Sequence, residues 1–370
     1  MRLYDTAKQA ITDFSPDKEV SIYTCGITPY DAAHMGHAAV YLTFDVLQRR
    51  LRDIGYQTRC VRNITDVDDS ILSKARQLGV HYLDLAASEM ARFDRDMGAL
   101  GLLPAYSEPR ATSAISDILK LVEELLSAGF AYTSNGSVYF EISKFERFGQ
   151  ISHLDRDAML EFARERGGNP DDPNKRDPLD FVLWQPSEPD EPAWDSLWGP
   201  GRPGWHIECS ALAMRELGRT IDLHGGGGDL IFPHHECEAA QSEAVTKKPF
   251  VRHWMHVAMV HLDGEKMSKS LGNLVFVEHL LSKYDSRAVR LSILNNHYRT
   301  AWEWNDEMIR SADQRLNLWL EAGAGSAGLE DVRSALDEDL DVPAAIRIID
   351  DAASKGLGVS DAAALLGVNI

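Results

Sequence analysis

The sequence predicts an α/β protein in which a parallel sheet is interrupted by an insertion and followed by a small helical bundle. Three observations support this fold class. Strand and helix patterns alternate over residues 18–75 and again from about 221 to 260. Residues 164–201 between them are rich in Pro, Asp, Gly and Lys, which predicts an irregular insertion or connection. From residue 306 the apolar spacing is helical throughout. We therefore expect a Rossmann-like domain over residues 1–305, with an insertion at about 95–200, and a helical bundle over 306–370.

The individual elements follow from the apolar pattern. The run Val20–Thr24 predicts a first strand, and the segment after it carries Val40, Phe44, Leu47 and Leu51 at the spacing of one helix face. Helical spacing covers residues 83–130, with an apolar stripe at 119–126, and Gly136–Ile142 predicts a strand. The later expected elements are strands near Ile221–Leu223 and Phe250–Val260, and helices near Met308–Leu320, Leu329–Leu336 and Ala344–Ala352.

The composition excludes several classes of protein. A chain of 370 residues with 44% hydrophobic side chains can bury a sizeable core, and it has neither a membrane-length apolar run nor a signal peptide, so we expect a cytoplasmic protein. A net charge of −19 without a Lys/Arg-rich tract argues against an extended nucleic-acid surface. Four scattered cysteines predict reduced thiols or metal ligands, namely Cys25, Cys60, Cys209 and Cys237.

Two short motifs together predict nucleotidyl transfer from ATP. HMGH at His34–His37 lies at the expected turn from the first strand into a helix, where backbone N–H groups and the helix dipole favour phosphate. KMSKS, at Lys266–Ser270, supplies lysines that can approach the same phosphates from the other side. Either motif alone is weak, since KMSKS also suits an ordinary solvated loop. Both in this order, more than 200 residues apart, point to adenylate formation.

Soft metal ligands occur in three distant segments. Cys25 ends the first strand, Cys209 lies in GWHIECS (Gly204–Ser210), and His234 and Glu238 lie four residues apart. A lone cysteine on a strand is more often a small buried hydrophobe, and a His–Glu pair at this spacing can be a salt bridge. Zinc, however, takes thiolate and imidazole ligands, and a catalytic site keeps one position open. An open zinc position would select a cysteine thiolate where shape separates cysteine from serine poorly.

Five segments closely resemble the cysteinyl-tRNA synthetase superfamily, whose catalytic domain is of the class I synthetase type. The resemblance covers nearly the whole chain. Its segments are CGITPYDAAHMGHA (Cys25–Ala38), NITDVDD (Asn63–Asp69), GRPGWHIECS (Gly201–Ser210), HGGGGDLIFPHHE (His224–Glu236) and DGEKMSKSLGN (Asp263–Asn273).

Two activities compete within that superfamily: charging tRNA with cysteine, and the mycothiol cysteine ligase reaction, which joins cysteine to the amino group of glucosaminyl-inositol. The ligases are favoured by the CGIT and HMGHA motifs, by ERGGNP (Glu165–Pro170) and by HYRTAWEWND (His297–Asp306). The chain also ends soon after its first helical stem, which leaves little room for an anticodon-binding domain. Four features depart from the ligases, among them a shorter N-terminus. The others are Glu238, which resembles the fourth zinc ligand of the synthetases, the synthetase-like AAQSE (Ala239–Glu243), and Val40 in place of a threonine.

The resemblance implies that cysteinyl-AMP forms first and then reacts with an acceptor amine. It implies ATP, L-cysteine and glucosaminyl-inositol as partners, Mg²⁺ with ATP, one Zn²⁺ per chain, a monomer, and no use of tRNA or membrane. Other acceptors, such as a carrier protein, stay open, as does a non-catalytic cysteine or adenylate sensor. The implied catalytic residues are His34, His37, Lys266 and Lys269, and the implied zinc ligands are Cys25, Cys209 and His234, with Glu238 a possible fourth. The implied cysteinyl-adenylate contacts are Cys25, Gly26, Ile27, Thr28, Asn63, Ile64, Thr65, Trp205, Gly227, Gly228, Asp229 and Val260.

Some of these residues have a plain structural explanation beside the functional one. The glycine run at 226–228 also suits a flexible turn, and Val260 also suits the core of a strand. We expect Cys60 and Cys237 to be structural. We also expect the acidic residues that follow Thr65 to be a helix cap and solvated carboxylates rather than a second metal site, namely Asp66, Asp68 and Asp69.

Overall fold

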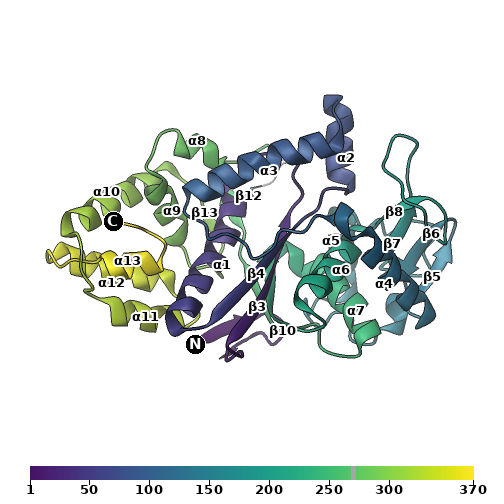
Figure 1. The fold of residues 1–370 in the computed structure, drawn as a ribbon, viewed down its shortest axis with the longest axis horizontal. Coiled ribbons are helices and arrows are strands. Elements are labelled where there is room, and N and C mark those ends of the chain that lie inside the picture. The colour runs from purple at the N-terminus through teal and green to yellow at the C-terminus, as the bar shows by residue number, and fades with distance from the viewer. Residues whose placement is uncertain (268–271) are drawn as a thin grey trace.

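A four-stranded parallel sheet forms the centre of the molecule. The computed structural model describes residues 1–267 and 272–370. The strands lie in the order β10-β9-β3-β4, so the two halves of the chain meet where β9 pairs with β3 (Figure 1). The predicted Rossmann-like α/β fold is confirmed. The strands are β3 (Glu19–Ile27), β4 (Gln57–Ile64), β9 (Ile221–Gly227) and β10 (Val251–Val257).

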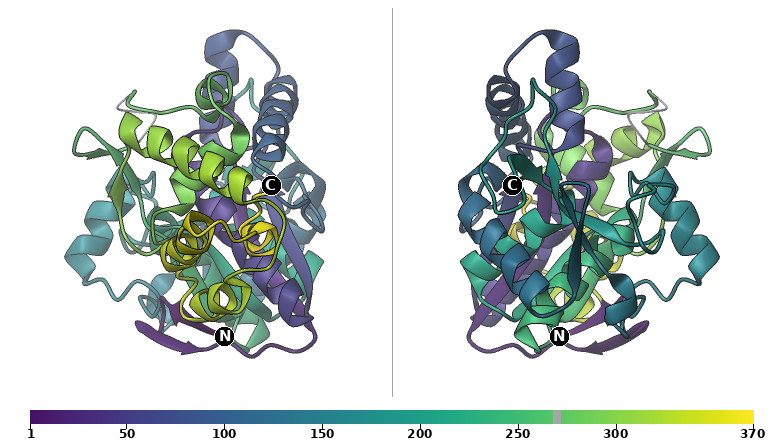
Figure 2. Two further views of the ribbon diagram at one scale, coloured as in Figure 1. Left: turned by 90° about the vertical axis from the view of Figure 1, so that its left-hand side faces the viewer. Right: turned by 90° about the vertical axis from the view of Figure 1, so that its right-hand side faces the viewer.

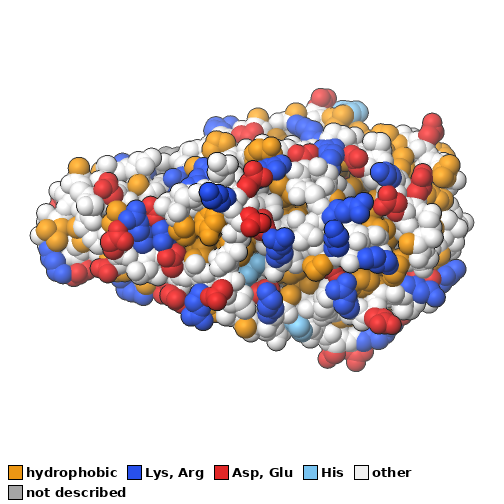
Figure 3. Space-filling model, turned by 60° about the horizontal axis from the view of Figure 1, so that its bottom comes forward, with side chains coloured by type: hydrophobic (Ala, Val, Ile, Leu, Met, Phe, Trp, Pro, Cys, Tyr) orange, Lys and Arg blue, Asp and Glu red, His pale blue; other side chains and the backbone are white. Residues whose placement is uncertain are grey.

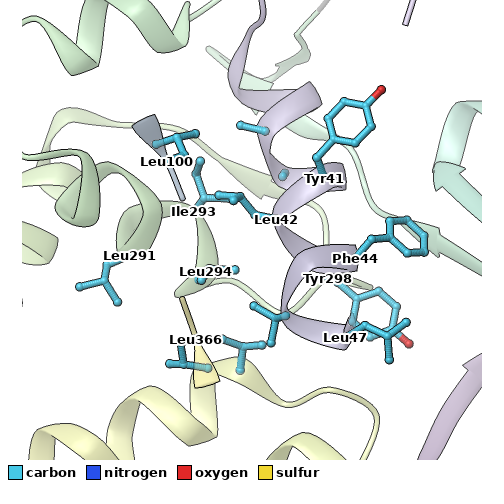
Figure 4. Packing of buried hydrophobic residues seen from close by; sticks show 14 of the residues in the cluster. Tyr41, Leu42, Phe44, Leu47, Leu100, Leu291, Ile293, Leu294, Tyr298 and Leu366 are labelled. Carbon is cyan, nitrogen blue, oxygen red and sulfur yellow. The ribbon is translucent and has the colours of Figure 1, made fainter. Parts of the chain in front are cut away.

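Helix α1 (Met35–Ile54) connects β3 to β4 and packs its predicted apolar face into the largest core. Phe44, Leu47 and Leu51 are buried there, and Leu42 points towards Ile293 of α9 (Ser286–Leu294; Figure 4). Gly55 ends α1 in the left-handed conformation, with φ of 110°, a backbone geometry that glycine adopts without strain.

The insertion forms a body of its own at one end of the molecule. Its antiparallel sheet has the order β5-β6-β7-β8 and shares a separate core with α4 (Ile115–Ser127) and α5 (Arg156–Glu165) (Figures 1 and 2). That core extends onto α6 (Trp205–Leu217) and α7 (Glu236–Thr246) of the central domain. The strands are β5 (Ala131–Ser134), β6 (Ser137–Phe140), β7 (Phe181–Pro186) and β8 (Gly201–Pro203).

Two expectations about this region are wrong in detail. Residues 164–201 are not irregular throughout, because Phe181, Leu183 and Trp184 are buried in β7 and only the flanking Pro- and Asp-rich parts are loops. Residues 83–130 are not one helical stretch. The chain leaves the helix near Leu100 and turns at Gly101, where φ is 76°, before α4 begins.

Four helices at the C-terminus lie at the opposite end from the insertion (Figures 1 and 2). The first begins at Asp306, where the sequence pattern turns wholly helical. A single apolar cluster contains both Val20 of the sheet and Val368 near the C-terminus, so these helices share the core of the central domain. The domain division at 305 stays a prediction. The helices are α10 (Asp306–Ala322), α11 (Leu329–Asp337), α12 (Val342–Ser354) and α13 (Ser360–Leu365).

On the face drawn in Figure 3, acidic and basic side chains are interspersed with one another and with apolar ones. Among the described residues, no helix combines the length and the apolar composition that a membrane crossing requires.

The remaining elements include β1 (Arg2–Asp5), β2 (Ala10–Asp13), α2 (Asp69–Leu78), α3 (Tyr82–Ala99), β11 (Val260–Leu262), β12 (Glu265–Lys266), α8 (Val277–Leu281) and β13 (Trp302–Glu303).

Candidate functional site

The carboxyl ends of β3 and β4 meet at one edge of the sheet and bring two predicted segments together. The Gly26 N–H donates to Asn63 Oδ1 at 2.8 Å, and the Thr65 N–H donates to the Ile27 carbonyl at 3.0 Å. A Cβ atom on Gly26 would lie 1.5 Å from the carbonyl oxygen of Asn63, so this approach requires glycine. The residues around Gly26 and those around Asn63 therefore line the same edge.

Two of the acidic residues that follow β4 make structural hydrogen bonds at this edge. Asp68 caps α2 by accepting from the Ile71 N–H at 3.0 Å, and its other oxygen accepts from Thr28 Oγ1 at 2.9 Å. The expected solvated role is wrong for Asp66, which is fully buried because its carboxylate accepts from the N–H and hydroxyl of Thr112. Thr28 is thus oriented by a helix-capping aspartate.

HMGH forms the first turn of α1. His34 is the N-cap residue, and its Nδ1 accepts from the Gly36 N–H at 3.1 Å. The rings of His34 and His37 stack with their centroids 3.8 Å apart. Both imidazoles therefore lie at the positive end of the helix dipole, where an anionic group is favoured.

The segment that contains KMSKS is anchored next to this turn. Strand β12, which ends at Lys266, the first residue of the motif, pairs antiparallel with β11. After the motif, the backbone of Phe276 bridges to His34, and the Val277 N–H donates to the Ala33 carbonyl at 3.0 Å. The structure thus brings the chain that follows the motif to the start of α1. The candidate catalytic residue Lys269 lies outside the described residues.

The four predicted metal ligands converge in the interior. One donor atom from each of Cys25, Cys209, His234 and Glu238 lies within 4.8 Å of the others, and all four residues are buried. Glu238 Oε1 lies 3.1 Å from His234 Nε2 and accepts from Cys25 Sγ at 3.5 Å. The ligand set predicted from three distant segments is therefore assembled in one place.

A second group of donors overlaps the first and was missed by sequence reasoning. His224 and His235 share Cys25 and Glu238 with it. His224 Nε2 lies 3.1 Å from Glu238 Oε2, and His235 Nε2 lies 3.3 Å from Cys25 Sγ. The available signal was the pair of adjacent histidines in FPHHE, but a sequence does not show which of the two rings faces the cysteines.

The electrostatics of this centre suit a soft divalent cation. Burial lowers the pKa of His234 and of His235, so both imidazoles are neutral, as metal ligands must be. Burial and the neighbouring Cys209 raise the pKa of the Cys25 thiol, an effect that a bound cation would reverse. Although His234 Nε2 lies 3.1 Å from Glu238 Oε1, the two atoms are not oriented for a hydrogen bond, and no other described residue offers one. Two sulfur donors, one nitrogen and one carboxylate match the ligands of zinc.

A second layer of contacts orients the predicted ligands. The indole of Trp205, the first residue of α6, stacks on the His234 ring with the centroids 4.1 Å apart. His206 Nδ1 lies 2.8 Å from His234 Nδ1, so the ring of His234 is held from two sides.

The remaining predicted contacts lie at the ends of β9 and β11. Gly227 ends β9, and Gly228 and Asp229 form the short helical turn that follows it. Val260 is buried in β11 and pairs with Trp302 of β13, within the HYRTAWEWND segment. Cys60 and Cys237 are buried and belong to neither donor group of the described residues.

Comparison with known proteins defines the class first. Residues 11–314 match the family described as tRNA synthetases class I (C) catalytic domain. A methionyl-tRNA synthetase from Mycobacterium tuberculosis, solved with methionyl-adenylate, has the same fold with a TM-score of 0.69. The two chains are 18% identical, and the match covers 91% of this chain and 83% of that one. The fold and the site therefore define a class I synthetase-type catalytic domain.

Full-length relatives then give the family. Proteins named L-cysteine:1D-myo-inositol 2-amino-2-deoxy-alpha-D-glucopyranoside ligase are 48% identical in Nocardiopsis dassonvillei and 47% identical in Thermobifida fusca. These matches cover 95% and 100% of this chain, and 88% and 93% of the respective relatives. The chain belongs to this family of ATP-dependent ligases, as the motifs predicted.

Proposed function

We propose that this enzyme joins L-cysteine to the amino group of glucosaminyl-inositol in two half-reactions. The cysteine carboxylate first attacks the α-phosphate of ATP, which gives cysteinyl-AMP and diphosphate. The acceptor amine then attacks the activated carbonyl, so that an amide forms and AMP leaves. One observation carries the proposal: the Cys25, Cys209, His234 and Glu238 donors converge at the sheet edge that also carries the HMGH turn.

We assign zinc to Cys25, Cys209 and His234, with Glu238 as a fourth ligand that yields to the substrate. Bound zinc would supply a Lewis-acidic position that prefers a thiolate to a hydroxyl group. The buried surroundings keep the histidine neutral, while Trp205 and His206 hold its ring in place. Selection by these donors matters, because pocket shape alone separates cysteine from serine by only about 1–3 kcal/mol.

The chain's own residues then position the reacting groups. His34 and His37 are proposed to hold the phosphates at the N-terminus of α1, and Lys266 and Lys269 to stabilise the departing diphosphate, with Mg²⁺ accompanying ATP. Asp229 is proposed to accept from the ribose hydroxyls, and Val260 to line the adenine pocket. The proposed contacts to the cysteinyl-adenylate are completed by Cys25, Gly26, Ile27, Thr28, Asn63, Ile64, Thr65, Trp205, Gly227 and Gly228.

The choice of acceptor rests on the relatives and on two segments. The relatives are named for a 2-amino-2-deoxy-glucopyranoside of inositol as the partner of cysteine. ERGGNP and HYRTAWEWND have the form that we expect of such ligases. One observation supports the alternative, which is charging tRNA with cysteine. Glu238 lies within the donor group, at the place where a fourth zinc ligand of the synthetases is expected. We further propose that the enzyme is a cytoplasmic monomer, which light scattering of the purified protein tests for its monomeric state.

An acceptor panel scored by AMP release tests the proposal. The zinc-loaded enzyme with ATP and cysteine is given glucosaminyl-inositol, glucosamine or cysteine tRNA. We expect cysteine-dependent ATP–diphosphate exchange without any acceptor, and AMP release stimulated most by glucosaminyl-inositol. Stimulation by tRNA alone would show that the amide ligase assignment is wrong. Absence of exchange would instead support a non-catalytic sensor.

A further inference from the structure

The ERGGNP segment, which no step of the proposed reaction uses directly, ends α5 in the insertion. Gly167 has φ of 80°, and the Gly168 N–H donates to the Ala163 carbonyl at 2.7 Å. A Cβ atom on Gly168 would lie 3.0 Å from that same carbonyl oxygen. The two glycines therefore turn the chain sharply at the end of the helix and fix the direction in which Arg166 leaves it.

Arg166 reaches out of the insertion to the central domain. Its Nη1 donates to the carbonyl oxygen of Asp229 at 2.6 Å and also to the carbonyl oxygen of Phe232. Its guanidinium lies over the Phe162 ring, 4.4 Å from the centroid, so the side chain is held from its own helix. One guanidinium thus ties together two carbonyls that lie three residues apart in the turn between β9 and α7.

This turn carries two residues of the candidate site. Asp229 is the proposed ribose contact, and His234, two residues after Phe232, is a predicted zinc ligand. Because backbone carbonyls at the end of a short helical turn otherwise lack partners, a charged donor that binds both fixes the path of the turn. The relative placement of the nucleotide contact and the metal ligand therefore depends on Arg166.

The insertion also holds the other end of this turn, at Glu236. Here backbone groups of the insertion donate to a side chain of the turn, whereas Arg166 is a side chain of the insertion that donates to backbone carbonyls. The carboxylate of Glu236 accepts from the backbone N–H groups of Gly149 at 2.8 Å, Ile151 at 3.1 Å and Ser152 at 3.0 Å. α5 packs on the segment as well. The 229–236 segment is thus clamped at both ends by the insertion, with His234 between the two clamps.

We propose that Arg166 is a positioning residue for adenylate formation, which holds the 229–234 turn so that Asp229 and His234 face one bound substrate. This inference rests on the proposed function for the roles of those two residues. Second-layer contacts of this kind typically change metal affinity or activity about 10- to 100-fold when they are removed. We expect a loss of that size in kcat/KM for ATP, carried by a higher KM for ATP.

Three variants test the inference through cysteine-dependent ATP–diphosphate exchange, which needs no acceptor. They are Arg166→Ala, Arg166→Lys and, as a matched control, Arg164→Ala. Arg164 lies on the same helix, is exposed, and forms an ion pair with the exposed Asp171 at 3.5 Å. We expect Arg166→Ala to lose about 10- to 100-fold in kcat/KM for ATP, Arg166→Lys to recover part of it, and millimolar methylguanidinium to restore activity to the alanine variant. Arg164→Ala should match the wild type.

The outcomes separate positioning from simple anchoring. If Arg166→Ala keeps the wild-type KM for ATP, the inference is wrong. It is also wrong if the activity of Arg166→Ala falls only as its melting temperature falls, and neither Arg166→Lys nor methylguanidinium restores activity. Should the alanine variant not fold, the KM of Arg166→Lys decides in the same way. A wild-type enzyme without exchange would overturn the proposed function itself, whereas an active wild type matched by Arg166→Ala would overturn this inference alone.

Discussion

The backbone of His34 forms an antiparallel bridge with the backbone of Phe276, which joins the N-cap of α1 to the segment that follows KMSKS. Next to it, the Met35 N–H donates to the Val275 carbonyl at 2.9 Å. The segment that follows KMSKS therefore lies against the first turn of α1, although the two are far apart in the sequence.

His34 has a structural role that can be separated from its proposed role in catalysis. Asparagine is as good an N-cap as any residue, so His34→Asn should keep the start of α1. His34→Ala should lower the free energy of unfolding by about 1 kcal/mol, since the cap is lost. Both variants should lose about 10²-fold in kcat for ATP–diphosphate exchange if the imidazole stabilises the phosphates. Urea unfolding and the exchange assay measure the two effects.

His81 supplies the matched control for this prediction. It caps α3 in the same manner, with Nδ1 accepting from the Leu83 N–H at 3.3 Å, but it has no place in the proposed site. His81→Asn should leave exchange unchanged. Wild-type exchange in His34→Asn would show that His34 is only a helix cap.

The buried donor group predicts a metal dependence that can be tested by removing one thiol. Cys209→Ala should leave the purified protein without stoichiometric zinc and should abolish cysteine-dependent exchange, because one of the three assigned ligands is gone. Zinc is measured by plasma mass spectrometry after dialysis. Cys60→Ala is the control, since Cys60 is equally buried but lies outside both donor groups. Equal zinc content in the two variants would exclude Cys209 as a ligand.

Much of this site could be predicted from the sequence because its parts lie at the ends of predicted strands. The resemblance implied that Cys25 and residues 63–65 contact the same cysteinyl-adenylate, and the carboxyl ends of parallel strands do meet at one edge. Cys209, His234 and Glu238 were recognisable by their chemistry and by their resemblance to known motifs. These predictions needed residue types together with the resemblance to known motifs.

Other parts could not be predicted, since they depend on which way a side chain or a backbone group faces. His224 and His235 belong to the donor group because of the directions in which their imidazole rings point, and the sequence around them does not show these directions. Asp66 is buried because Thr112, from the start of the insertion, supplies two donors to it. The contact of Arg166 with the Asp229 carbonyl involves a backbone atom, which any residue would offer. Each of these arises from tertiary packing between distant segments.

Gly26 should be irreplaceable for a purely steric reason. A Cβ atom there would lie 1.5 Å from the Asn63 carbonyl oxygen, so Gly26→Ala must push β3 away from β4 at the edge that carries Cys25. We expect exchange to fall by at least about 10²-fold, the cost of a displacement of about 1 Å in an active site. Gly98→Ala is the control: nothing lies within 4 Å of its Cβ position in α3, so it should be active and slightly more stable. A fully active Gly26→Ala variant would contradict the close approach of β3 to β4 at Gly26.

A buried ion pair between Asp45 and Arg290 ties α1 to α9, and it should make stability depend on pH. Both side chains are fully buried, and Arg290 Nη1 also donates to the Leu100 carbonyl at 3.0 Å. Burial alone would raise the pKa of Asp45, but Arg290 and Arg49 more than offset it, so this pKa lies below its ordinary value of 3.8. Asp45→Asn leaves the guanidinium of Arg290 buried without its counter-charge, which should cost about 3–5 kcal/mol at neutral pH.

The sign of the pH dependence follows from the lowered pKa. A carboxyl group with a folded-state pKa below its unfolded value of about 3.9 stabilises the fold fully above that value and progressively less as pH falls through the folded pKa. The difference in unfolding free energy between wild type and Asp45→Asn should therefore be constant from about pH 5 to 8 and shrink below about pH 4. Asp351→Asn serves as the control, because its pair with Lys355 at 2.5 Å is exposed and should contribute less than about 1 kcal/mol. Urea unfolding across this range measures both variants. A difference for Asp45→Asn that stays the same down to about pH 3 would mean that the charge of Asp45 is not what holds α1 to α9.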